Sequence, residues 1–315
     1  MDPTRFDVDV APGGYVWWYL DALSDDGAHG LTIIAFIGSV FSPYYAHARH
    51  RGGSAIADPL AHCAINVALY GKGANRWSMT ERRASEVTRS ATRLQIGPSA
   101  LAWTGDTLTL HLDEVTAPLP RRLRGTIEVK TGARPTHRVA LDAQGRHRWG
   151  VIAPAARIDV AFDAPRLAWS GSAYLDSNRG SVPLEHDFTR WNWSRGHLAD
   201  GRTAVVYDIE RREGGPFAIA DWFDAEGGHG AFEPPPVAPL PVTRWGLARE
   251  TRSELATAPT IALPLEDGPF YSRSVVNTRW LGQPVTSVHE HLSLQRFDRR
   301  WVRALLPFRM PRRFW

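Results

Sequence analysis

Cysteine is almost missing from this 315-residue chain, and its scarcity removes several classes of protein. The single Cys63 excludes an internal disulfide and a cysteine-based metal cluster, so a reducing compartment is favoured. Long apolar runs are also missing, because the longest one, Leu31 to Phe41, is interrupted by Gly38 and Ser39 and is too short to span a bilayer. The stretch from Met1 to Gly14 is polar and acidic, so we expect no signal peptide.

Long helical periodicity and the common catalytic motifs are equally scarce. The sequence contains no Gly-x-Ser-x-Gly motif, which argues against an ordinary hydrolase, and Gly71-Lys-Gly73 lacks the third glycine of a dinucleotide fingerprint. The best helix candidate runs from Ser78 to Arg93, where Ser78 and Glu81 could form a capping box. His289-Glu290-His291 places two histidines on one strand face, but no third ligand follows at a telling spacing, so we expect no metal site.

The formal net charge is +4, and the basic excess is concentrated at the C-terminal end. A mixture of arginines with aromatic and aliphatic residues suits an anionic lipid surface, and the alternative is a last core strand followed by a basic tail. Basic residues elsewhere are scattered among acids, so we expect no nucleic-acid binding. The residues in question are Arg296, Arg299, Arg300, Arg303, Arg309, Arg312 and Arg313, with Phe297, Trp301, Leu305, Leu306, Phe308, Phe314 and Trp315.

What the sequence has in abundance is strand signals and aromatic residues, including 13 tryptophans. Short apolar or alternating runs recur between turn dipeptides such as Asp26-Gly27 and Gly105-Asp106, which predicts an all-β fold of barrels or sandwiches. The predicted strands are Tyr15 to Leu23, Leu31 to Ile37, Leu101 to Trp103, Leu108 to Leu112, Arg157 to Asp163, Thr203 to Ile209, Phe217 to Phe223, Tyr271 to Trp280 and Pro284 to Leu294.

An internal echo predicts two related domains. Trp17 precedes Asp26-Gly27 by nine residues, Trp191 precedes Asp200-Gly201 by nine residues, and each pair is followed by an apolar strand. Such self-similarity at about half the chain length indicates a repeated unit. We therefore expect one β-barrel domain over residues 1–165 and a second over residues 166–315, which carries the basic aromatic tail.

The candidate chemistry lies in two short strands. Tyr174 and Asp176 alternate onto one face of the stretch from 171 to 180, and His147 and Trp149 show the same spacing 27 residues earlier. If the two strands are neighbours, these four side chains line one pocket wall. A carboxyl group among aromatic rings is penalised when charged and tends to hold a proton, and a neutral carboxylic acid is a general acid.

Four runs of the sequence resemble the acyclic carotenoid 1,2-hydratases of purple phototrophic bacteria, also called hydroxyneurosporene synthases. The runs are Tyr15 to Ser24, His29 to Tyr45, Trp77 to Arg82 and Tyr174 to Trp193. This family belongs to a wider group of lipocalin-like two-domain proteins, some of which are pericyclases. The resemblance implies two lipocalin-like (calycin) barrels packed together, with a site for a long apolar ligand between or within them.

The resemblance also implies the reaction, in which water adds across the terminal C1=C2 bond of neurosporene or lycopene without a cofactor. The family carries its essential residues at the His-x-Trp and Tyr-x-Asp positions, which are His147, Trp149, Tyr174 and Asp176 here. In this hypothesis Asp176 protonates C2, Tyr174 orients it, and His147 holds the water and accepts its extra proton. Aromatic rings face the cation at C1. They belong to Trp149 and to substrate-binding tryptophans at Trp17, Trp18, Trp191 or Trp193, which we infer from the residues and not from the resemblance.

Two alternatives stay open at this stage. A non-catalytic lipocalin-like carrier would use the aromatic pocket but not the acid, and a pericyclase-like isomerase on the same scaffold would need no proton donor. We expect the partners to be an acyclic carotenoid, water and a membrane surface. The expected location is the cytoplasmic side of the inner or photosynthetic membrane, with peripheral attachment. The sequence does not indicate an oligomeric state.

Overall fold

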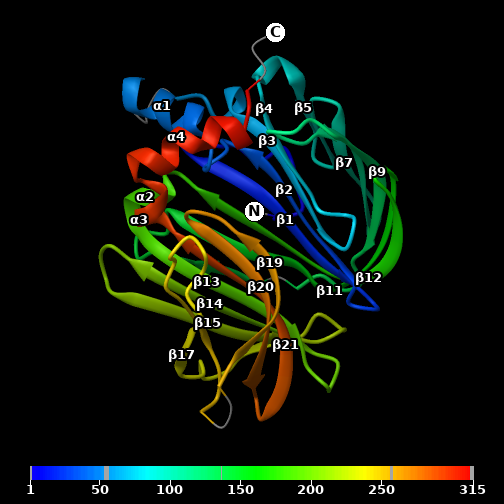
Figure 1. Cartoon of the computed structure of the whole chain (residues 1–315), viewed down its shortest axis with the longest axis vertical. Coiled ribbons are helices and arrows are strands. Elements are labelled where there is room, and N and C mark those ends of the chain that lie inside the picture. The colour runs from blue at the N-terminus through cyan, green and yellow to red at the C-terminus, as the bar shows by residue number, and fades with distance from the viewer. Residues whose placement is uncertain (1, 53–56, 136, 256–257, 313–315) are drawn as a thin grey trace. The chain divides into compact units, whose positions relative to one another are not determined.

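A computed structural model describes residues 2–52, 57–135, 137–255 and 258–312, and it divides the chain into two units built mainly of β-strands (Figure 1). The first unit takes residues 1–140, 144–183 and 304–315, and the second takes residues 141–143 and 184–303. The boundary expected at residue 165 therefore differs from the one found at residue 183. The reason is that residues 166–180 form one strand. Its residues 171–180 pair with every residue of Tyr15–Ser24 in the first unit.

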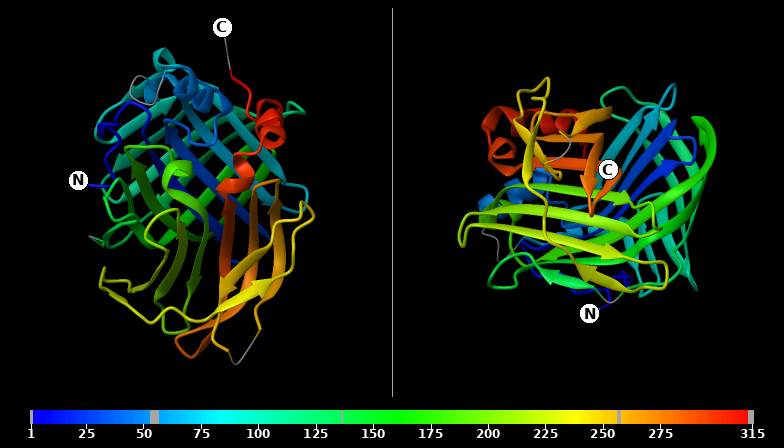
Figure 2. Two further views of the ribbon diagram at one scale, coloured as in Figure 1. Left: turned by 90° about the vertical axis from the view of Figure 1, so that its left-hand side faces the viewer. Right: turned by 90° about the horizontal axis from the view of Figure 1, so that it is seen from below.

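The first unit is a twelve-stranded sheet that curves into a nearly closed barrel (Figure 2). Its main path follows the order β4-β3-β2-β1-β12-β11-β9-β8-β7-β6-β5, with β10 paired to β11. The elements are β1 (Tyr15–Ser24), β2 (His29–Ile37), α1 (Pro43–Gly52), η2 (Pro59–Ala61), β3 (Cys63–Gly71), β4 (Arg76–Arg82), η3 (Ala84–Glu86), β5 (Val87–Arg89), β6 (Arg93–Ile96), β7 (Ser99–Thr104), β8 (Thr107–Val115), β9 (Arg122–Lys130), β10 (Arg138–Ala140), β11 (His147–Ala164) and β12 (Arg166–Gly180).

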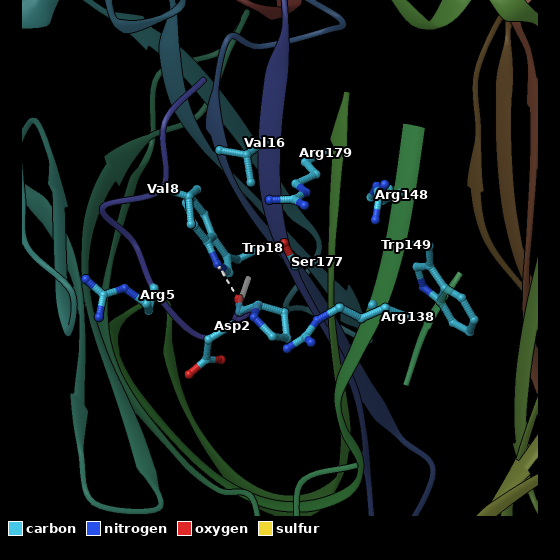
Figure 3. Close-up of a pocket in the computed structure, with 12 residues that line it drawn as sticks. Asp2, Arg5, Val8, Val16, Trp18, Arg138, Arg148, Trp149, Ser177 and Arg179 are labelled. Atoms are coloured by element: carbon cyan, nitrogen blue, oxygen red, sulfur yellow. Dashed lines mark hydrogen bonds between the residues drawn. The ribbon is translucent and has the colours of Figure 1, made fainter. Parts of the chain in front are cut away.

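The inside of this barrel is packed with the chain's own side chains. Strand alternation sends Trp18 and Leu20 of β1 into the core, where Phe6 and Val8 of the N-terminal segment join them. The Trp18 Nε1 donates to the Pro3 carbonyl oxygen at 2.9 Å, which fixes that segment across the barrel (Figure 3). Two cavities that Trp18 lines have volumes of only about 30 Å³ and about 10 Å³. Neither of them could hold a long polyene.

The second unit is a seven-stranded sheet in the order β16-β15-β14-β13-β21-β20-β19, accompanied by the two-stranded β17-β18. Its core packs Val206, Trp280 and Val285 together. The elements are α2 (Leu184–Asp187), β13 (Phe188–His197), β14 (Thr203–Arg211), β15 (Pro216–Phe223), β16 (His229–Ala231), β17 (Val237–Leu240), β18 (Arg249–Arg252), β19 (Thr260–Asp267), β20 (Tyr271–Trp280), β21 (Gln283–Ser293), α3 (Leu294–Phe297) and α4 (Arg300–Arg309). Helix α4 continues past residue 303 into the range assigned to the first unit.

The internal echo of the sequence corresponds to a repeated hairpin. β1 pairs with β2 around Asp26-Gly27, and β13 pairs with β14 around Asp200-Gly201. Gly27 and Gly201 have φ angles of 68° and 88°, a backbone region that glycine enters without steric cost. The all-β prediction is confirmed. Each predicted strand lies within an observed strand, except that the one predicted over Pro284 to Leu294 extends one residue beyond β21.

The helix predicted over Ser78 to Arg93 is wrong. Its first part belongs to β4, which pairs residue by residue with β3, and the rest forms η3, β5 and the start of β6. The β-branched and hydroxyl side chains of this stretch favour extended backbone, and Ser78 is fully buried in the sheet. Half of a capping box forms five residues later than expected, where the Arg83 backbone N–H donates to Glu86 Oε2 at 3.3 Å at the start of η3.

The C-terminal region is helical and is not the last strand and loose tail that one alternative predicted. Val302, Leu306 and Met310 form a buried stripe at helical spacing along α4 and just beyond it. The Arg312 guanidinium then donates to Glu81 Oε1 at 2.6 Å, so the chain is held against β4 of the first unit. The last three residues of the predicted tail, Arg313, Phe314 and Trp315, lie outside the described residues.

Candidate active site

The candidate site lies on the face of the first sheet that points away from the barrel core. In β12, Ala173 and Leu175 belong to the core cluster, so alternation turns Tyr174 and Asp176 to the opposite face. Asp176 is nevertheless only 3% exposed, and Tyr174 is fully buried. A carboxyl group so far removed from water is an unusual feature in a β-strand.

Asp176 receives two hydrogen bonds on one oxygen. The Trp149 Nε1 donates to Asp176 Oδ2 at 2.8 Å, and the Tyr174 hydroxyl donates to the same oxygen at 3.1 Å. Three of the four side chains that the sequence placed on one wall are therefore in direct contact. Donors on Oδ2 stabilise the carboxylate, whereas burial favours the neutral acid, so the two effects oppose each other. This balance suits a group that must give up a proton and then regain it.

The contact depends on a hairpin of two long strands. β11 and β12 pair antiparallel, with Trp149 opposite Asn178 and Val151 opposite Asp176. The sequence predicted two separate strands here, whereas residues 147–164 form one strand. β-bulges flank Ala153, where Pro154 can sit in the strand without donating to the ladder.

His147 contacts a tyrosine. Its Nδ1 lies 2.8 Å from the Tyr15 hydroxyl, and the register sets both residues opposite Gly180. A Cβ at Gly180 would come within 2.6 Å of both side chains, so the absence of a side chain there lets them meet. His147 lies opposite Gly180, which is four residues from Asp176 in β12. This separation corresponds to about 13 Å along the strand.

Aromatic rings line the same sheet face on both sides of the acid. Tyr15 stacks on Trp17 with ring centroids 4.9 Å apart, and Trp17 in turn contacts Phe36 of β2 at 5.9 Å. Tyr19, directly opposite Asp176 in the register, meets the edge of Tyr174 at 6.4 Å. We call this surface the aromatic wall. It combines large apolar area with phenol and indole groups.

The four predicted substrate-binding tryptophans have different positions. Trp17 belongs to the aromatic wall, but Trp18 points to the other side of β1 and packs against Phe6 in the core, 5.0 Å between ring centroids. Figure 3 shows Trp149 on the far side of its strand from Trp18. Trp191 and Trp193 belong to β13 of the second unit, where Trp191 contacts Tyr207 at 6.1 Å. Period-two alternation alone separates Trp17 from Trp18.

The sequence interpretation gave no role to Asp21, a second carboxyl residue on the wall. Asp21 is fully buried and stands directly opposite Tyr174 in the β1–β12 register. Its sequence signal was the interruption of the apolar run Tyr15 to Leu23 by one acid. Alternate residues of a strand share a face, so Trp17 and Tyr19 would have placed Asp21 on the aromatic face.

The histidine pair that suggested the start of a metal site makes hydrogen bonds within the second unit. The Nδ1 of His289 lies 2.9 Å from Ser194 Oγ, and the Nδ1 of His291 lies 2.7 Å from Asn192 Oδ1. Burial is the main cause that lowers the pKa of His289 to about 3 and that of His291 to about 4. Both rings are therefore neutral structural groups at neutral pH.

Two lipocalin-like β-units with a buried carboxyl on an aromatic wall define the class of this protein, a lipocalin-like enzyme. The chain belongs to the carotenoid hydratase family, because the family model described as "Carotenoid hydratase CrtC" matches residues 33–315. It is 51% identical over 311 residues to the acyclic carotenoid 1,2-hydratase of Rubrivivax gelatinosus, covering 98% of this chain and 76% of the relative. The corresponding protein of Thiocapsa roseopersicina is 52% identical over 309 residues, covering 98% and 75%. The chain is therefore a hydratase, that is, a hydro-lyase.

Solved structures show the same fold at low sequence identity. A putative AttH protein from Nitrosomonas europaea matches with a TM-score of 0.58 and 16% identity, covering 93% of this chain and 99% of that one. Kievitone hydratase from Nectria haematococca matches with a TM-score of 0.54 and 9% identity, covering 95% and 97%. These likenesses confirm the lipocalin-like fold class.

Proposed function

We propose that this chain adds water across the terminal C1=C2 bond of an acyclic carotene such as neurosporene or lycopene, giving the 1-hydroxy carotenoid. The observation that carries the proposal is the buried Asp176 carboxyl with Trp149 and Tyr174 donating to one of its oxygens. The names of the relatives, acyclic carotenoid 1,2-hydratases, support the choice of substrate.

The reaction begins with proton transfer from Asp176 to C2 of the alkene. Oδ2 accepts two hydrogen bonds, so Oδ1 is the oxygen assigned to carry the proton. The C1=C2 electron pair forms the new C2–H bond and leaves a tertiary cation at C1. The two donors on Oδ2 stabilise the carboxylate that remains. Water then bonds to C1 and loses its extra proton, and return of a proton to Asp176 completes the cycle without redox change.

The aromatic wall offers ring faces to the cation and apolar area to the polyene. The faces of indole and phenol rings attract a cation by about 2 kcal/mol or more in a desolvated site. Trp149 lies beside the acid through its hydrogen bond, and Tyr19 is paired with Asp176 across the strands. Trp17 and Phe36 extend the same wall with apolar area for the hydrocarbon. We assign to His147 a positioning role, because it holds the Tyr15 hydroxyl at the end of the wall.

The two rival functions make less use of this geometry. A carrier of apolar ligands gains nothing from a buried carboxyl group, which costs free energy to desolvate. A pericyclase-like isomerase needs shape but no proton donor. The donor arrangement around Asp176 therefore favours hydration over both.

The test is Asp176→Asn in the full chain, assayed with lycopene in water enriched in oxygen-18. Wild-type protein should give a 1-hydroxy product that carries the label, and the variant should fold normally but give none. Asp113→Asn is the matched control, because Asp113 lies on β8 in an ion pair with Arg122, away from the wall. A folded Asp176→Asn variant with near wild-type turnover would remove Asp176 from its role, and unlabelled bound pigment would identify a carrier.

We also propose that the protein attaches peripherally to the cytoplasmic face of the inner or photosynthetic membrane. In the part of the chain that the structure describes, no helix is both long and apolar enough to cross a bilayer. Helix α4, however, carries a second apolar stripe at Trp301, Leu305 and Phe308, and Phe308 is 70% exposed. Trp245 stacks on Trp301 with ring centroids 6.1 Å apart and enlarges this stripe.

The charge around the stripe indicates an anionic partner. Arg299 and Arg300 are exposed at the start of α4, and Arg296 lies over the Trp301 ring at 5.5 Å. Exposed aromatic rings beside arginines match the depth and charge of an anionic lipid interface. We call the set Trp245, Trp301, Leu305 and Phe308 the docking stripe. A membrane-attached enzyme would meet its hydrophobic substrate where that substrate is dissolved.

A further inference from the structure

Hydration needs a base that takes a proton from water as well as an acid that protonates the alkene. A row of buried side chains beside Asp176 contains a candidate for this base. Tyr174 of β12, Asp21 of β1 and Thr32 of β2 are successive partners across three neighbouring strands. Directly paired residues point to the same face, so all three belong to the face of the acid. Each is 3% exposed or less.

The register puts Asp21 close to the acid. Tyr19 is the direct partner of Asp176, and Asp21 follows it by two residues, so Asp21 and Asp176 are diagonal neighbours. Such neighbours lie about 7–8 Å apart, a span that a water molecule and the end of an alkene can occupy together. His147, the residue first assigned to the water, is aligned about 13 Å along the strand from Asp176. The sheet geometry therefore favours Asp21 over His147.

Thr32 provides an independent sign that a ligand binds beside Asp21. Its hydroxyl oxygen is buried and has no hydrogen-bond partner among the described residues. Buried hydroxyl groups in folded proteins are nearly always satisfied by protein or by water. A water molecule between Thr32 and Asp21 would satisfy the hydroxyl and would meet a carboxylate that can accept its proton.

We propose that Asp21 and Thr32 bind the attacking water, with Asp21 as the general base of the hydration. This assignment rests on the proposed function. The water oxygen forms a bond to C1 of the cation, one of its protons passes to Asp21, and the Thr32 hydroxyl orients it. The proton taken by Asp21 balances the one that Asp176 gave to C2. The carboxylate of Asp21 also stabilises the neighbouring positive carbon while the bond forms.

The experiment separates water addition from alkene protonation. Asp21→Asn, Thr32→Val and Asp176→Asn are incubated with lycopene in deuterium oxide, and both hydration and deuterium in the recovered lycopene are measured. A cation that water fails to capture must lose a proton. Loss from C2 returns lycopene with deuterium at C2, and loss from a terminal methyl group gives the isomer with a terminal methylene group, which also carries deuterium at C2. We expect Asp21→Asn to lower hydration about 100-fold while deuterium still enters the substrate. Thr32→Val should lower hydration less, and Thr32→Ser should restore it.

The outcomes distinguish the two proposals. Near wild-type hydration by folded Asp21→Asn would overturn the role of Asp21, and so would equal loss of hydration and deuterium entry. Asp176→Asn should lose both signals, and deuterium entry that persists in this variant would instead overturn the proposed function. Asp113→Asn serves as the control for a general effect of removing a carboxylate, and circular dichroism checks that each variant is folded.

Discussion

The Trp149 indole N–H and the Asp176 carboxyl meet at 2.8 Å although 27 residues separate them in the chain. The hairpin of β11 and β12 brings them together, and both side chains are buried. The bond orients the acid and fixes the ring that faces the proposed cation. In the proposed mechanism, Trp149 thus supports both alkene protonation and stabilisation of the cation.

Trp149→Phe tests this contact, because it keeps an aromatic ring and removes the donor. We expect a folded protein whose kcat for hydration falls by about tenfold or more, since a lost hydrogen bond to a charged group costs about 1.5–3 kcal/mol. The rate should be measured at saturating substrate. Trp103→Phe is the matched control, because its Nε1 donates to the Thr4 carbonyl at 3.0 Å away from the wall. Equal losses in both variants would contradict the assignment.

Phe308→Glu combined with Leu305→Glu tests the docking stripe. The charged side chains should weaken binding to vesicles that contain phosphatidylglycerol, because they cannot enter the lipid interface and they repel its charge. Sedimentation with vesicles measures the effect, and hydration of lycopene in detergent should stay unchanged. Leu119→Glu is the control, since Leu119 is 71% exposed and belongs to a different surface loop. Unchanged vesicle binding by the double variant would refute the docking stripe.

Acid should destabilise the protein through His289. Burial lowers its pKa from the usual 6.5 to about 3 in the folded state, so between these values the unfolded chain binds more protons than the folded one. Stability contributed by neutral His289 is therefore complete above pH 6.5 and decreases as the pH falls toward 3. The loss is at most about 1.4 kcal/mol per pH unit.

Urea unfolding at several pH values measures this slope. His289→Gln should show a shallower decrease below pH 6.5, because glutamine does not titrate, and His111→Gln at an exposed position serves as the control for replacing a histidine. His291, whose pKa is lowered to about 4 for the same main reason, would still contribute part of the slope. An unaltered slope in the His289 variant would show that the ring does not control acid stability.

The sequence predicted strands better than it predicted partners. Alternation in Tyr15 to Leu23 and Arg157 to Asp163 was sufficient to identify strands, because one face of each is apolar. It did not reveal that residues 147–164 form one strand, since the bulges around Pro154 break the period. The helix predicted from Ser78 failed because pairing with β3 overrode a local capping pattern.

The candidate site shows the same limit. The spacing of Tyr174 and Asp176 and the same spacing of His147 and Trp149 predicted one common wall, and the resemblance implied that the four are the family's essential residues. Only the register revealed that Trp149 reaches the acid, that His147 meets Tyr15, and that Asp21 stands beside Tyr174. Long-range pairing carries this information, and no single segment of the sequence contains it.

The N-terminal segment crosses the inside of the first barrel, where Pro3 accepts a hydrogen bond from Trp18. Phe6 and Val8 fill the interior of the barrel, so the barrel core supports the aromatic wall from behind. Under the proposed function, mutations behind the wall would change melting behaviour, while mutations on its outward side would change which hydrocarbon is accepted. Selection could adjust durability and substrate preference independently, because opposite sides of one sheet carry them.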